Sequence, residues 1–201
     1  MDVYWDDYFN KELEQLANGK LDYRHVFNLG KPSEILLKTG FPVTDDIELA
    51  SGQIARKAKQ HGFAITDVKG LVNAINNPVA VFYYGDADKA QNVIVDLKEG
   101  DKNFLVGIHF NQTQRGARIS DIRGLLPKNT EEWLNWITQR KALYLNIEKI
   151  QAIIDQQRIN LAEVGYLNLD SIENILDEHK SVNNYFPPRS KLEQNENFLR
   201  I

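Results

Sequence analysis

The sequence predicts an α+β fold in which N-terminal helices pack on a roughly four-stranded antiparallel sheet and further helices follow at the C-terminus. Two observations predict it. Apolar residues recur at helical spacing in most of the first 75 residues, and at every second position in several runs between residues 79 and 126. The connections between those runs are too short for crossover helices, so the strands are expected to be antiparallel.

Helices and short extended segments precede the sheet. Residues 4–17 place aromatic side chains and leucines on one helical face, and Asn18-Gly19 is typical of a helix end. The other elements expected here are a short strand over 25–29, a helix over 32–38, an extended segment over 41–49, and helices over 52–60 and 67–75 with Ser51 and Thr66 as their N-caps.

The stretch 104–128 is the centre of the predicted sheet. Alternation over 104–110 gives one apolar face, and the other face with the following residues carries a run of polar side chains. Turn residues at 85–88 and 99–101 make it one part of a meander. The expected strands are 79–84, 92–97, 104–110 and 118–126, followed by a helix over 131–140, a short edge strand over 142–145 and helices over 147–157 and 170–179.

This pattern divides the chain of 201 residues into three parts. Residues 1–34 form an N-terminal helical extension, residues 35–146 an α+β domain, and residues 147–201 a C-terminal helical extension and tail. The length suits one domain with a small appendage.

Composition excludes several function classes. The chain has no cysteine and only four widely spaced histidines, which argues against disulfides, a thiolate nucleophile and a zinc cluster. It has no run of about 18 apolar residues, and its acidic start is unlike a signal peptide, so a cytoplasmic protein without a membrane partner is expected. No phosphate-binding glycine loop or other cofactor motif is present, so no cofactor is predicted.

The charge pattern argues against a general nucleic-acid binder but allows a local anion site. The formal net charge is −4, whereas non-specific affinity for nucleic acids depends on Lys and Arg. Within residues 53–61, however, Arg56, Lys57 and Lys59 occur without an acid. An anion could bind there.

The polar side chains near the predicted sheet suit metal-independent RNA cleavage. A base removes a proton from a 2′-hydroxyl, an acid protonates the leaving oxygen, and cations stabilise the charged intermediate. His61 is the first candidate for acid or base, since imidazole titrates near neutrality, and Lys57 lies one helical turn earlier. His61 also fits a structural role, in which its charge favours the helix dipole.

The other candidates come mainly from residues 104–128, and each also has a structural explanation. His109 fits a hydrogen-bonded rim position, the arginines fit solvated strand charges, and Tyr144 fits core packing. The predicted catalytic residues are His61, Lys57, Ser120, Arg123 and Tyr144; the predicted substrate-binding residues are Lys59, His109, Arg115 and Arg118; no metal ligand is predicted.

Short motifs follow one another between Ile35 and Tyr144. They are Gly40-Phe41-Pro42, Lys59-Gln60-His61, the run NPVAVF over 77–82, the two central strands, residues 119–128, Trp136 and Ala142-Leu143-Tyr144. This order resembles the C-terminal domain of phage MuF-type proteins, a member of the barnase, EndoU, colicin and RelE-like nuclease group.

The resemblance implies a ribonuclease-like fold of helices on a four-stranded antiparallel sheet, as in toxins delivered or encoded by phages and mobile elements. It implies His61 as general acid or base and a small hydroxyl near position 124. Gly124 stands there instead. Either Ser120 and Arg123 take over that role, or the domain has lost catalysis.

Three hypotheses follow. The first is a toxin-like ribonuclease, cytoplasmic or delivered into another cell, with RNA as substrate and an inhibitor or immunity protein as partner. The second is a catalytically silent domain of the same fold, acting as a phage or mobile-element accessory or interaction protein. The third is an immunity-type binding protein whose acidic terminal segments form the interface. The first requires His61 and Lys57 to fold over the polar face of residues 104–128; no oligomeric state is predicted.

Overall fold

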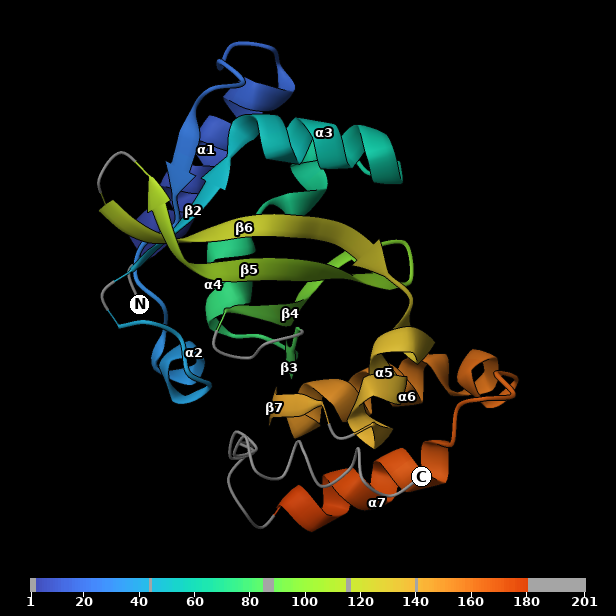
Figure 1. Cartoon of the computed structure of the whole chain (residues 1–201). Coiled ribbons are helices and arrows are strands. Elements are labelled where there is room, and N and C mark those ends of the chain that lie inside the picture. Colours follow the sequence, from blue (N-terminus) through green and yellow to red (C-terminus); the bar gives the residue numbers. More distant parts are fainter. Residues whose placement is uncertain (1–2, 44, 85–88, 115–116, 140, 181–201) are drawn as a thin grey trace, which may run out of the picture.

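The structure is a computed structural model, and it describes residues 3–43, 45–84, 89–114, 117–139 and 141–180. The described residues form an α+β fold around one mixed sheet of seven strands, in the order β1-β2-β6-β5-β4-β3-β7 (Figure 1). The strands are β1 (Val26–Asn28), β2 (Asp46–Ala50), β3 (Ala80–Tyr83), β4 (Ala90–Glu99), β5 (Lys102–Gln114), β6 (Ala117–Lys128) and β7 (Ala142–Leu145).

The predicted sheet is right in its centre and wrong in its size. The meander β3-β4-β5-β6 is antiparallel throughout, as the alternation and short turns indicate. The short edge strand predicted over 142–145 is β7. The expectation of about four antiparallel strands is wrong, because β1, β2 and β7 join the same sheet and β2 pairs with β6 in parallel, Asp46–Glu48 against Ile119–Asp121. Everything from the helix after β2 to β5 separates these two strands in the chain, which allows a parallel pairing.

Helices flank the sheet, close to the predicted positions. One predicted helix, over 67–75, is divided in two, because Gly70 takes a left-handed conformation with φ of 81° between the parts. The described helices are α1 (Val3–Ala17), α2 (Glu34–Lys38), α3 (Ser51–His61), the 3₁₀ turn η1 (Ile65–Val68), α4 (Leu71–Asn76), α5 (Thr130–Thr138), α6 (Ile147–Ala162) and α7 (Leu169–Lys180). None of the helices within these described ranges is long and apolar enough to cross a membrane.

Neither predicted N-cap serves as one. The N-cap of α3 is Ala50, and the Ser51 hydroxyl instead donates to the Asp22 carbonyl at 2.8 Å. Thr66 lies inside η1, which is capped at Ala64. Side-chain type alone therefore placed these helix starts one or two residues off.

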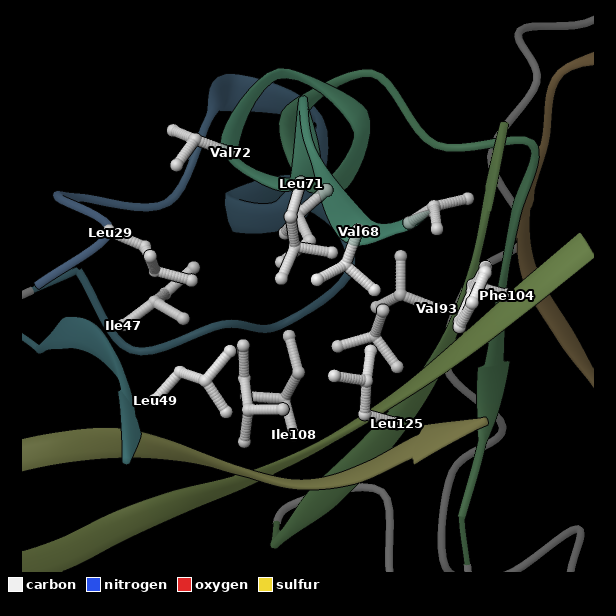
Figure 2. Packing of buried hydrophobic residues seen from close by; sticks show 14 of the residues in the cluster. Leu29, Ile47, Leu49, Val68, Leu71, Val72, Val93, Phe104, Ile108 and Leu125 are labelled. Carbon is white, nitrogen blue, oxygen red and sulfur yellow. The ribbon is translucent and has the colours of Figure 1, made fainter. Parts of the chain in front are cut away.

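One face of the sheet packs on α1, α3 and α4. Figure 2 shows Val68 and Leu71 directed toward Ile108 and Leu125 of the sheet. Each such buried side chain contributes about 1.5–3 kcal/mol relative to an exposed one. In α3 the residues that enter this core are Ile54 and Ala58, so α3 is held with its opposite side in solvent.

The other face packs on α5, α6 and α7 over only part of its area (Figure 1). Trp133 and the isoleucines of α6 cover Phe82, Ile94 and Leu105. By alternation, Gly107 and His109 lie on the same face as Leu105, further along β5. That second portion of the face is where polar side chains gather.

Candidate functional site

Strand register brings an imidazole, a carboxylate and a guanidinium together. His109 of β5 lies opposite Asp121 of β6, and opposed residues of antiparallel strands project from the same face. The Arg123 Nε donates to the Asp121 Oδ2 at 3.0 Å. Three groups able to move protons or hold an anion therefore meet on two adjacent strands.

Two further side chains border this group. The ring of Tyr84, the residue after β3, lies edge-on to the His109 ring with 5.9 Å between centroids, and 53% of Tyr84 is exposed. The Gln112 Oε1 accepts from the Arg123 Nη2 at 2.5 Å. We call Tyr84, His109, Gln112, Asp121 and Arg123 the polar face.

A pair of glycines explains how Arg123 comes to project there. Gly107 lies opposite Gly124, but the next pair is Ile108 with Ile122, so Arg123 is an extra residue in β6. Such bulges re-aim a side chain. A Cβ at Gly124 would lie 3.0 Å from the Gly107 nitrogen and 3.1 Å from its Cα. The hydroxyl that the family resemblance implies near position 124 therefore has no room at this position.

The His109 imidazole is held toward its neutral form. Burial lowers the pKa of His109 from its usual value, the Arg123 charge lowers it further, and the Asp121 carboxylate acts in the opposite direction. The proton that His109 binds is consequently released more readily than that of a free histidine.

Replacing Arg123 with glutamine is expected to raise the pKa of His109. The change removes a nearby positive charge and leaves Asp121 to stabilise the imidazolium. Titration of the His109 ring by NMR measures it. Lys128→Gln, which removes a cation from the other end of β6, is the control and should leave the His109 pKa unchanged. An unchanged or lower pKa in Arg123→Gln would contradict this electrostatic picture.

The predicted α3 residues form a separate group. Lys57 and His61 lie one turn apart on α3, as their spacing predicts, and Lys59 is exposed on the same helix. Burial, then the charges of Lys57 and Arg56, lower the pKa of His61. The His61 Nε2 is buried and makes no hydrogen bond to the described residues. The helix α3 packs on the face of the sheet that α1 and α4 also cover, whereas the polar face lies on the opposite face. His61 therefore does not lie over the polar face.

The remaining predicted residues are scattered. Ser120 is 1% exposed, with its hydroxyl buried. Tyr144 is 4% exposed and belongs to the core that α1, α3 and α4 form with the sheet. Tyr144 lies on β7, which β5, β4 and β3 separate from β6, a distance of roughly 19 Å at the usual strand spacing. Arg118 is exposed near the start of β6, and Arg115 lies outside the described residues. Of the predicted site residues that the structure describes, His109 and Arg123 come together on the polar face.

Asp121, Gln112 and Tyr84 were not predicted. Asp121 and Arg123 flank the apolar Ile122, and this alternation could have placed both on one face. The partnership with His109 depends on register, which shifts at two places between β5 and β6, so periodicity alone could not find it.

The polar face offers chemistry through its own side chains. Asp121 and His109 can exchange protons, and Arg123 can stabilise an anion. No group of three or more His, Asp or Glu side chains in the described part of the chain could hold a metal ion.

Comparison with known proteins gives one family. Residues 53–152, just under half of the chain, match the family model described as the phage MuF-C-terminal domain. The matched segment begins in α3, ends in α6 and includes all the residues of the polar face. No curated protein and no solved structure matches the chain. The part of the chain that carries the candidate site is thus similar to the phage MuF C-terminal domain.

Proposed function

We propose that this protein cleaves RNA phosphodiesters without a metal ion, at the polar face. The observation that carries the proposal is the contact of Asp121 with Arg123, opposite His109 on the neighbouring strand. A base, an acid and a cation are the groups that this reaction needs.

The polar face suggests a role for each group. Asp121 takes the proton of the RNA 2′-hydroxyl, whose oxygen then forms a bond to phosphorus. His109, protonated, gives its proton to the 5′-oxygen as the bond from that oxygen to phosphorus breaks. Arg123 stabilises the charge on the pentavalent phosphorus in between. The products are a 2′,3′-cyclic phosphate and a free 5′-hydroxyl.

The proposal keeps the reaction that the sequence predicts but assigns the acid to His109 in place of His61. His61 lies on α3, on the face of the sheet opposite the polar face, and its Nε2 is buried. His109 is half-buried and lies beside the exposed ring of Tyr84. An aromatic face next to the acid suits a single-stranded substrate, whose bases stack on such rings.

Cleavage of a single-stranded RNA in the presence of EDTA tests the proposal. We expect products that end in a 2′,3′-cyclic phosphate, and no cleavage when all 2′-hydroxyls are replaced by hydrogen, because the attacking oxygen is then absent. Mass spectrometry of the products reads out both. Intact RNA, cleavage that stops with EDTA, or cleavage of the deoxy chain would each contradict the proposed mechanism.

One observation favours a second candidate, a catalytically silent accessory domain. Asp121 and Gln112 both bond to Arg123, and such a group can serve simply to hold strands together. An absence of cleavage, with intact folding, would favour this candidate.

A further inference from the structure

A pocket of about 320 Å³ lies next to the polar face, between α3 and β6. Figure 1 shows α3 running alongside β6. Asp121 and Arg123 belong both to the polar face and to the lining of the pocket, so the two are continuous. The complete lining is Ala50, Gln53, Arg56, Asp121, Ile122 and Arg123.

The pocket exists because β2 is short. Its pairing with β6 stops at Asp121, and the chain turns directly into α3 after Ala50. Beyond that point a side chain takes the place of the missing strand, as the Gln53 Nε2 donates to the Arg123 carbonyl. The Arg123 carbonyl at the edge of β6 thus has a hydrogen-bond donor, but the space beside it stays open as the pocket.

Arg56 gives the pocket a positive charge. Its Nη2 donates to the Gln53 Oε1 at 2.7 Å and its Nη1 to the Gln60 Oε1 at 3.5 Å. These amide oxygens position the guanidinium but do not neutralise it. Among the described residues, the side-chain bonds of Arg56 go to these amide oxygens, so its charge can meet an anion.

We propose that this pocket binds a backbone phosphate of single-stranded RNA, next to the phosphate cleaved at the polar face. The inference rests on the proposed function, because it takes its substrate from it. Guanidinium and amide donors are common phosphate ligands. A volume of about 320 Å³ is at the small end of ligand pockets, and α3 and β6 bound it on two sides, which leaves room for one strand rather than a duplex.

Binding of a fully 2′-O-methylated oligonucleotide, which cannot be cleaved, tests this phosphate site. Arg56→Gln is compared with Lys11→Gln, which removes the same charge from an exposed position of α1, outside the pocket and the polar face. We expect Arg56→Gln to raise Kd about fivefold and to lower the slope of log Kd against log salt by about 0.7, while Lys11→Gln leaves both unchanged. Equal effects of the two variants, or none from Arg56→Gln, would overturn the inference.

A second titration, with inorganic phosphate alone, distinguishes the source of the anion. We expect it to bind far more weakly than the oligonucleotide. If Arg56→Gln reduced phosphate binding and left oligonucleotide binding unchanged, the pocket would be a site for free phosphate and the inference would be wrong. Because these measurements use an uncleavable strand, they give an answer even if the protein does not cleave RNA.

Discussion

His109→Ala is expected to lower the rate of RNA cleavage by about 10²–10⁴-fold, the usual contribution of a positioned general acid. The imidazole opposes Asp121 in register and is the group on the polar face able to give a proton to the leaving oxygen near neutral pH. Initial rates on a fluorescent single-stranded RNA, under saturating substrate, measure the effect on kcat.

His61→Ala is the matched control. It removes the same type of side chain from α3, on the face of the sheet opposite the polar face. The cleavage rate should stay at the wild-type level provided the protein remains folded. The opposite result, a large loss with His61→Ala and little with His109→Ala, would place the chemistry on α3, where the sequence suggested it.

The pH profile provides an independent reading of the same residue. An acid must be protonated to act, and burial with Arg123 lowers the pKa of His109. The wild-type rate should therefore fall as pH rises through a value below the usual histidine pKa of about 6.5. In Arg123→Gln this fall should move to higher pH, although the maximum rate is lower. A profile without a histidine limb would argue against His109 as the acid.

Gly124→Ser is expected to lower the free energy of unfolding by about 1–3 kcal/mol, the usual cost of overpacking. The added Cβ would lie 3.0 Å from the Gly107 nitrogen and 3.1 Å from its Cα. Both are backbone atoms of the paired strand, so the strain cannot be relieved by a side-chain rotation and must separate β5 from β6. Urea denaturation followed by circular dichroism measures the loss.

Gly165→Ala is a suitable control, since a Cβ there meets nothing within 4 Å. Its effect on unfolding should be close to zero. Wild-type stability in Gly124→Ser would mean that the two strands separate easily at this point. The Arg123 bulge would then not depend on the glycine pair.

The central strands could be predicted because their pattern is local. In β5 the apolar residues Phe104, Val106 and Ile108 recur at every second position, which indicates a strand and one buried face without further information. The parallel partner of β6 is not local. Asp46–Glu48 lies more than seventy residues earlier, and nothing in its own sequence selects β6 over another strand. The sheet was therefore predicted too small.

The α3 site was misplaced for a reason that the sequence contains. Ile54, Ala58 and His61 follow one another at spacings of four and three, so all three share one face of a helix. The first two enter the core, and the His61 Nε2 is buried as well. His109 and Arg123 were recognised as candidates by residue type, but Asp121 could join them only once the register of β5 and β6 was known.

The strand order also affects how the protein meets other extended chains. The two outermost strands, β1 and β7, have three and four residues, whereas the long strands β4, β5 and β6 lie inside the sheet. An unpaired sheet edge is a template for another extended chain, and short edges are a common protection against such association. Where β2 ends, α3 lies beside the uncovered edge of β6. The longest strands therefore offer little free edge with which a strand of another chain could pair.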